Sequence, residues 1–140
     1  MKVFLDANIL VSVLNKEFPL ANHTTRLLSV APSKKIKLYT SPICLAITYY
    51  FCSKKYNANI AREKILLLAN NINLALSKET DIAFIANNKS IEDFEDGLQY
   101  CAALNAGCTC IVTEDTNDYY FSKIEILNTE DFFDKHIFKS

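Results

Sequence analysis

A short apolar run at the start of the chain ends abruptly in charge. Lys2-Val3-Phe4-Leu5 leads directly into Asp6, and a second apolar run extends from Ile9 to Leu14. The first run predicts a buried strand, and the second, too long to belong to that strand, predicts a helix. Asp6 would lie between them, at the carboxyl end of the strand, where open α/β sheets bind their ligands. The alternative is that Asp6 only caps the helix, since Asp is a favoured N-cap residue.

Helical and strand patterns alternate along the rest of the chain. Ser41-Pro42 is a helix-start signal, Ser90-Ile-Glu-Asp93 resembles a capping box, and Gly107 is a helix stop. Strands alternating with helices predict βαβ units, and therefore an α/β fold with a mostly parallel sheet of about five strands. Further helices are expected at residues 20–30, 41–55, 60–70, 77–87, 90–107 and 129–137, and further strands at 37–40, 72–76, 109–113 and 124–126.

Composition favours one folded domain over residues 1–140. Half of the 140 residues are hydrophobic, which is enough for a sizeable core, and the low contents of Gly (2) and Pro (3) argue against disorder and against a turn-rich all-β fold. The formal net charge is -1, so contact with nucleic acid through bulk positive charge is excluded and local patches would have to provide it.

The five cysteines are predicted to be small buried hydrophobes in a reducing compartment. Their number is odd and most lie in apolar stretches. Cys108-Thr-Cys110 is a poor zinc signature, because only His23 and His136 could complete the set of ligands. The amino-terminal apolar run is broken by Asp6 and Asn8, which argues against a signal peptide or a membrane span. We therefore expect a cytoplasmic protein without a membrane partner.

Acidic residues gather around two of the expected strands. Asp115 and Asp118 follow the strand at 109–113, and Asp96 lies in the preceding helix beside Asp93. If that strand neighbours the first one, these acids and Asp6 converge at one edge of the sheet. Acids in a first helical turn are explained by the helix dipole and loop acids by turn chemistry, but Asp96 is expected beyond the first turn.

Converging carboxylates repel one another unless a cation is present, and hard divalent cations prefer oxygen ligands. The chemistry that such a site supports is metal-assisted hydrolysis of a phosphodiester, in which one or two metals activate water and stabilise the leaving oxygen. The sequence holds no glycine-rich phosphate loop and no nucleophile elbow that would indicate another mechanism.

Four segments together resemble the PIN-domain family, and more narrowly the VapC-like toxin ribonucleases. The order and spacing of these segments cover nearly the whole chain. They are residues 4–10 (FLDANIL), 40–42 (TSP), 93–103 (DFEDGLQY with Ala102-Ala103) and 111–119 (IVTED with Asp118-Tyr119).

The resemblance implies a three-layer α/β/α fold, Mg²⁺ or Mn²⁺, and cleavage of single-stranded RNA. It also implies a cognate antitoxin and a homodimer. By the resemblance Asp6, Asp96 and Asp115 are metal-site acids and Asp118 is a nearby catalytic acid. Asn8, Ser41 and Thr113 would be supports that orient those carboxylates.

One position departs from the family pattern. The family usually carries an acid six residues after the serine that begins the helix at Ser41, and here that position is Ile47. Residues 41–53 hold no acid at all, so the site lacks one carboxylate, and weakened activity is expected. Asp93 and Glu95 are the first candidates to supply the missing oxygen.

Lysines, arginine and tyrosines supply the candidate contacts to RNA. Basic residues cluster at Lys34, Lys35 and Lys37 and again at Lys54, Lys55, Arg62 and Lys64, although such runs are usually solvated surface. Tyr49, Tyr50 and Tyr56 could stack on bases, but tyrosines at helical spacing more often belong to a core.

Two functions of other classes stay open. One is a catalytically weak or silent PIN-like module that binds RNA or a protein, which Ile47 favours. The other is a phosphoryl-transfer enzyme of the haloacid-dehalogenase or receiver type with Asp6 as nucleophile. Such an enzyme needs a second Asp two residues later and a Lys after a later strand, whereas Asn8 and Thr113-Glu114-Asp115 stand at those places.

Overall fold

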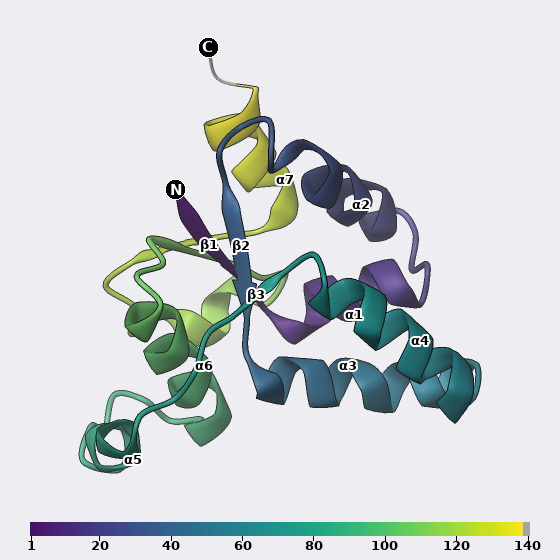
Figure 1. Ribbon diagram of the computed structural model, residues 1–140. Helices are drawn as coiled ribbons and strands as arrows, with labels where there is room; N and C mark the ends of the chain where they lie inside the picture. Colours follow the sequence, from purple (N-terminus) through teal and green to yellow (C-terminus); the bar gives the residue numbers. More distant parts are fainter. Residues whose placement is uncertain (139–140) are drawn as a thin grey trace.

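A single five-stranded sheet forms the centre of the protein, whose computed structural model describes residues 1–138 (Figure 1). The strands lie in the order β3-β2-β1-β4-β5, and every neighbouring pair is parallel. The first strand of the chain is therefore central, and all the carboxyl ends meet at one edge. The strands are β1 (Lys2–Leu5), β2 (Lys37–Thr40), β3 (Asn73–Leu74), β4 (Cys110–Val112) and β5 (Glu125–Leu127).

Helices cover the sheet on both sides. In Figure 1, α1 to α4 and α7 lie to the right of the sheet and α5 and α6 to the left, which confirms the expected three-layer α/β/α arrangement. The helices are α1 (Ala7–Leu14), α2 (Leu20–Val30), α3 (Pro42–Lys55), α4 (Ala58–Ala69), α5 (Glu79–Ala86), α6 (Phe94–Asn105) and α7 (Thr129–Phe132). A 3₁₀ turn, η1 (Thr116–Tyr119), and a π turn, η2 (Phe133–Ile137), complete the elements.

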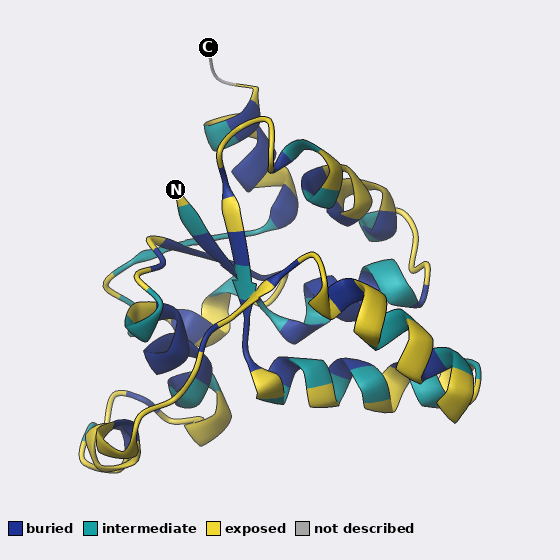
Figure 2. Cartoon of the chain, in the orientation of Figure 1, coloured by how far each residue is buried: buried dark blue, intermediate teal, exposed yellow. Residues whose placement is uncertain are grey.

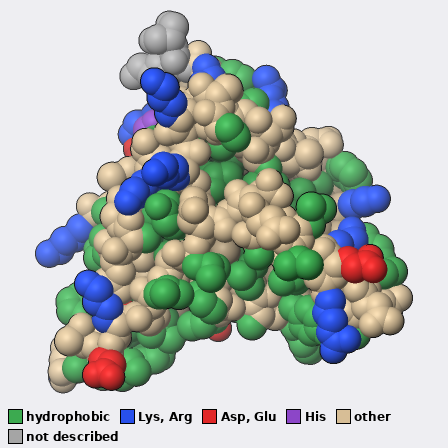
Figure 3. All heavy atoms as spheres, viewed as in Figure 1, with side chains coloured by type: hydrophobic (Ala, Val, Ile, Leu, Met, Phe, Trp, Pro, Cys, Tyr) green, Lys and Arg blue, Asp and Glu red, His purple; other side chains and the backbone are tan. Residues whose placement is uncertain are grey.

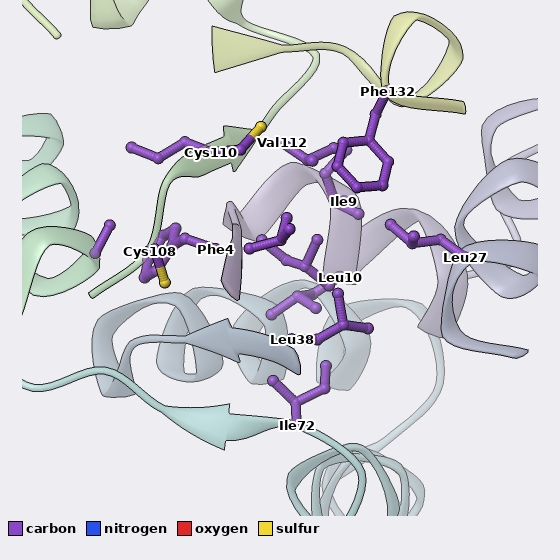
Figure 4. Close-up of a cluster of buried hydrophobic side chains, with 14 of the residues drawn as sticks. Phe4, Ile9, Leu10, Leu27, Leu38, Ile72, Cys108, Cys110, Val112 and Phe132 are labelled. Atoms are coloured by element: carbon purple, nitrogen blue, oxygen red, sulfur yellow. The ribbon is translucent and has the colours of Figure 1, made fainter. Parts of the chain in front are cut away.

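The core lies between the central strands and the helix layers. Val3, Phe4 and Leu5 of β1 are fully buried, as expected for a strand covered on both faces. Phe4 lies among Ile9 and Leu10 of α1, and Phe132 of α7 packs into the same cluster (Figure 4). Figure 2 shows the consequence, since β1 is buried along most of its length while α3 and α4 carry exposed faces. The rigid centre of the molecule thus holds the residue that follows β1.

Local signals set the ends of several helices. Ser41 caps α3 by accepting a hydrogen bond from the Cys44 backbone N–H at 3.0 Å, and Pro42 occupies the first helical position. Gly107 follows the end of α6 with φ +81°, a conformation that side chains disfavour. No helix in residues 1–138 combines the length and apolar character that crossing a bilayer requires.

The expected start of α6 at Ser90 is wrong. The helix begins at Phe94, and Asp93 is its N-cap, accepting a hydrogen bond from the Asp96 N–H at 3.0 Å. The Ser90 hydroxyl instead donates to the Asn88 side chain at 2.6 Å. Ile91, in the segment that joins α5 to α6, is buried against Ile85 and Cys101 of these helices. Asp96 therefore lies in the first turn of α6, where the helix dipole favours a negative charge.

Candidate active site

A cleft of about 490 Å³ opens at the carboxyl edge of the sheet. Its lining brings together residues from β1's end, α1, α3, α6 and the loop after β4. Seven of its residues are acidic, and none is basic. The acidic lining residues are Asp6, Glu17, Asp93, Glu95, Asp96, Asp115 and Asp118, and the others are Ala7, Asn8, Val11, Ile47 and Phe51.

Asp6 is held where β1 passes into α1. Its Oδ1 accepts a hydrogen bond from the Ala7 N–H at 2.8 Å, so it caps α1 as well as lining the cleft. Its Oδ2 accepts a hydrogen bond from the Thr113 hydroxyl at 2.9 Å. Burial raises the pKa of Asp6, and the charge of Asp115 raises it further, while the Ala7 and Thr113 bonds oppose both effects. Both interpretations of Asp6, cap and site residue, are thus compatible with the geometry.

A polar network ties the end of β4 to the start of α1. The Asn8 side-chain amide donates to the Thr113 hydroxyl at 3.0 Å and to Asp115 Oδ2 at 3.1 Å. The amide oxygen of Asn8 accepts from the Glu114 N–H at 3.1 Å, and the Thr113 hydroxyl accepts from the Asp115 N–H at 3.1 Å. Since β1 and β4 are neighbours, Asn8 and Thr113 fix Asp6 and Asp115 relative to each other.

Asp96 faces the same cleft from α6. Burial raises the pKa of its carboxyl to about 7, with further contributions from the charges of Asp93, Asp118 and Asp6. The next residue, Gly97, lets α6 pack closely, because a Cβ there would come within 2.8 Å of the Ile85 Cγ2 atom. A larger residue at Gly97 would push apart α5 and α6 and displace Asp96.

The other predicted acids lie at the rim of the cleft, and Ser41 lies behind it. Asp93 and Asp118 are exposed lining residues, and burial and the charges of Asp93 and Asp6 raise the pKa of Glu95. The Ser41 hydroxyl hydrogen-bonds to Gln99 and caps α3, and it forms no hydrogen bond to a carboxylate of the cleft lining. Its position is therefore that of a residue that fixes α3 against α6.

The wall that α3 contributes is apolar. Ile47 lines the cleft and packs partly against the main core, and Phe51, one turn later, lines it as well. Val11 of α1 completes this apolar wall. The helix after Ser41 therefore faces the cleft as the resemblance implied, with Ile47 at the place where the family usually has an acid.

Glu17 in the cleft was not anticipated from the sequence. After α1, Lys16 adopts φ 54°, and the Glu17 N–H donates back to the Ser12 carbonyl at 2.8 Å. This is a Schellman-type ending, which reverses the chain and brings Glu17 to the cleft. A glycine commonly marks such a turn, and here a lysine occupies the position, so the sequence carried no usual signal.

Two buried groups beside Asp6, the Cys44 thiol and the Tyr119 hydroxyl, were also not anticipated from the sequence. The Cys44 thiol donates to Asp6 Oδ1 at 3.8 Å, and burial together with the Asp6 charge raises the pKa of that thiol to about 12. The Tyr119 hydroxyl is buried and has no partner in hydrogen-bond geometry within residues 1–138, yet it lies close enough to Asp6 to lower that carboxyl's pKa. All five cysteines are buried and free, as expected.

The donor set fits a hard divalent cation. Within the part of the chain that the structure describes, no three Asp, Glu, His or Cys side chains are close enough to enclose one ion. Mg²⁺, however, keeps several waters and uses only one or two carboxylates, so separated acids around an open cleft suit it. Burial is the main cause of the raised pKa of Asp96, and a cation would relieve the further contribution from repulsion by the neighbouring acids.

Comparison with known proteins gives similar sequences and folds. The family model described as PIN domain matches residues 2–117. The chain is 28% identical over 134 residues to Ribonuclease VapC1 of Aquifex aeolicus (strain VF5), covering 94% of this chain and 92% of that protein.

Solved structures share the fold at low sequence identity. VapBC2 from Rickettsia felis, bound to a DNA fragment from its promoter, matches with a TM-score of 0.72 at 18% identity, covering 91% of this chain and 98% of that one. VapC20 from Mycobacterium tuberculosis, a sarcin-ricin loop cleaving toxin, matches with a TM-score of 0.67 at 14% identity, covering 88% and 97%.

Proposed function

The chain belongs to the PIN domain family, and on this basis we propose that it is a metal-dependent endoribonuclease that cleaves single-stranded RNA. We further propose that it is the toxin of a toxin–antitoxin pair. The similarity to Ribonuclease VapC1 over most of both chains supports the reaction class. The VapBC and VapC20 structures with the same fold support the assignment as a toxin.

The observation that carries the proposal is the convergence of Asp6, Asp96 and Asp115 in one cleft. These acids come from three separate elements, and the pKa values of Asp6 and Asp96 are raised by burial and by mutual repulsion. Perturbed acids gathered in a cleft are typical of functional sites. Asn8, hydrogen-bonded to Asp115, stands where a phosphoryl-transfer enzyme would need its second Asp, which disfavours that alternative.

In this proposal Asp6, Asp96 and Asp115 hold Mg²⁺ or Mn²⁺, and Asp118 lies at the rim beside them. The metal, when bound, supplies an activated water and stabilises the leaving oxygen of the phosphodiester. Thr113 orients Asp6 and Asn8 orients Asp115 through hydrogen bonds, and the Ala7 N–H holds the other carboxylate oxygen of Asp6. Val11, Ile47 and Phe51 form the apolar side of the cleft.

Ile47 is expected to weaken the metal site. An isoleucine offers no oxygen, and affinity for hard cations depends on the charge of the ligands. We therefore propose that the site binds one metal weakly, needs millimolar concentrations and favours Mn²⁺. Asp93, Glu95 and Glu17 line the same cleft and are the acids that could compensate.

The second candidate function is a PIN-like module that binds RNA or a protein but cleaves slowly or not at all. Two observations favour it, namely Ile47 in the cleft wall and the absence, within residues 1–138, of three potential ligands in a closed arrangement. It shares the fold and the cleft with the leading proposal and differs from it only in chemistry.

We propose an antitoxin partner, a homodimer and a cytoplasmic location for this protein. Solved VapBC structures with the same fold support the antitoxin. Exposed Leu66 and Leu67 on α4 supply apolar surface that a partner or a second copy could cover. Five free cysteines accord with a reducing compartment. Light scattering at micromolar concentration tests the dimer, and a monomeric mass would contradict it.

Cleavage of labelled single-stranded RNAs tests the function. Wild type should cut slowly with Mn²⁺ and stop when the metal is chelated, and Ile47→Glu should cut faster. If both proteins are inert on varied sequences with Mn²⁺ present, the binding module becomes the function. Fast cleavage by wild type at low metal would instead mean that another acid supplies the missing oxygen, and Glu95→Gln, Asp93→Asn and Glu17→Gln would identify it.

A further inference from the structure

Two aromatic rings stand exposed next to each other on α3. Tyr50 is 50% exposed and Phe51 is 48% exposed. Their ring centroids are 5.3 Å apart and their planes meet at 78°, an edge-to-face pair. Such a pair fixes both rings while leaving aromatic surface in contact with solvent. Tyrosines at this helical spacing were expected to belong to the core, and Tyr50 does not.

The aromatic pair continues the apolar wall of the cleft. Phe51 is itself a lining residue, and Ile47 precedes it by one turn on the same side of α3. The Lys54 ammonium lies 4.6 Å from the centroid of the Tyr50 ring, a cation–π contact that covers one face of that ring. The exposed surface of Phe51 is therefore the part of the pair that adjoins the acidic residues.

The acidic cleft offers no positive charge to bind RNA, whereas aromatic rings can bind its bases. Its lining holds seven acids and no lysine or arginine, so its side chains repel an RNA backbone. On the face of the molecule seen in Figure 3 the basic side chains are scattered and form no single patch. Stacking of bases on aromatic rings does not depend on the charge of the phosphates, and it is the common means of holding single strands.

We propose that Phe51, braced edge-on by Tyr50, is a stacking subsite for one nucleobase of single-stranded RNA beside the site of cleavage. The inference rests on the proposed ribonuclease function and adds to it the residue that holds the neighbouring base. Lys54 places a positive charge next to the pair, where it meets the phosphate of the stacked nucleotide. A purine, with its larger ring system, should bind there more tightly than a pyrimidine.

Binding of fluorescein-labelled oligoadenylate and oligouridylate, followed by anisotropy with Mg²⁺, tests the subsite. The parent is Asp6→Asn, which lowers the charge of the cleft and keeps the RNA intact. Phe51→Leu removes the ring and keeps apolar area, and Phe51→Trp restores a ring. Phe84→Leu on α5 is the matched control, because Phe84 is 48% exposed, as Phe51 is, and lies outside the cleft.

We expect Phe51→Leu to bind oligoadenylate about tenfold more weakly, the scale of one base–aromatic stack, and oligouridylate less so. Phe51→Trp should bind at least as tightly as the parent, and Phe84→Leu should match it. Equal affinity of Phe51→Leu and Phe84→Leu would overturn the subsite. So would a parent that binds no RNA, or a change in mass of Phe51→Leu by light scattering, which would make the pair a contact between copies.

The test separates the subsite from the reaction. Cleavage by the protein with native Asp6 is measured independently, with Mn²⁺, on the same oligonucleotides. If the native protein never cleaves but Phe51→Leu still weakens binding, the subsite stands and the ribonuclease proposal falls. If the native protein cleaves and Phe51→Leu binds as the parent does, the reverse holds.

Discussion

Two walls of the cleft differ in polarity, one being charged and the other apolar. On the wall formed by the ends of β1 and β4, Asp6 and Asp115 are held by a hydrogen-bond network through Asn8 and Thr113. On the wall formed by α3, Ile47 and Phe51 offer no polar atom. The first wall carries charge that burial penalises, and the second carries apolar surface that water penalises. In the proposed function the polar wall, together with Asp96 of α6, would hold the metal, and the apolar wall would pack against the substrate.

If Ile47 replaces an acid, as proposed, the polar wall can keep its shape without that acid. The polar wall is fixed mainly by parallel strands at the centre of the sheet, and its one hydrogen bond from α3 comes from the Cys44 thiol and not from Ile47. Ile47 packs partly against the main core and adds stability where an acid would add repulsion. The following experiments alter the polar wall, the apolar wall or Asp96 of α6.

The largest effect is expected from Asp6→Ala. This change removes the acid that the neighbouring carboxylates face, and cleavage should fall more than about a hundredfold, since even residues that only orient ligands cost ten- to hundredfold. Initial rates on single-stranded RNA with Mn²⁺ provide the measurement. Asp134→Ala, an exposed acid outside the cleft, is the control and should leave the rate unchanged. Comparable rates for both variants would show that the polar wall is not catalytic.

Thr113→Val should cost about ten- to hundredfold in metal affinity, because the hydroxyl that connects Asp6, Asn8 and Asp115 is lost. Calorimetric titration with Mn²⁺ measures the change, and Thr113→Ser should restore the affinity. The control is Thr24→Val, since Thr24 is equally buried but bonds Ser12 away from the cleft. Similar losses from both valine variants would mean that only general destabilisation was observed.

Ile47→Glu turns part of the apolar wall polar and should tighten Mn²⁺ binding about tenfold, because one more carboxylate raises the ligand charge. Cleavage should become faster at low metal, while the melting temperature without metal should fall since a core contact is lost. Ile47→Gln has nearly the same size without the charge. The explanation by charge fails if the Gln variant binds metal as tightly as the Glu variant.

The smallest effect concerns pH without metal. The pKa of Asp96 is raised to about 7 in the folded protein from an ordinary value of 3.8, so the folded state holds more protons between these values. Stability should therefore fall as pH rises from about 4 to 7, by linkage. Differential scanning fluorimetry should show the decline, a smaller one for Asp96→Asn, and a rise in melting temperature with Mg²⁺ or Mn²⁺. A melting temperature that changes with neither pH nor metal would count against a cluster of repelling acids in the cleft.

Asp6→Asn should raise the melting temperature of the metal-free protein, because it removes a buried charge and its repulsion with Asp115.

Sequence patterns predicted the fold closely where they were local and repeated. The helices at Leu20–Val30 and Pro42–Lys55 and the strand at Lys37–Thr40 have the expected limits, because caps, prolines and apolar periods act within a few residues. The helix start predicted at Ser90 was wrong, since a capping-box pattern does not indicate that Ile91 must be buried ahead of the helix. The expected five strands are present and all are parallel.

The candidate site was predicted unevenly for a physical reason. Asp6, Asp96 and Asp115 follow strand ends or begin a helix, so the topology of the sheet brings them together, although their roles stay predictions. Glu17 and Phe51 reach the cleft through a helix ending and a helix face whose directions depend on tertiary packing. The sequence carried no usual signal for the turn that brings Glu17 to the cleft, whereas Phe51, one turn after Ile47, could have been inferred once α3 was expected to face the cleft.

The central position of β1 has a kinetic consequence. The strand precedes the other four in the chain, and its partners come much later, since Leu5 meets Thr40 at a separation of 35 residues and Asp6 meets Thr113 at 107. Contacts between residues so distant in the chain close slowly and late in folding. A nascent chain that ends before β4 lacks Asp115 and leaves one side of β1 unpaired. The acidic cleft in its described form therefore forms only after residues 110–118 have been made.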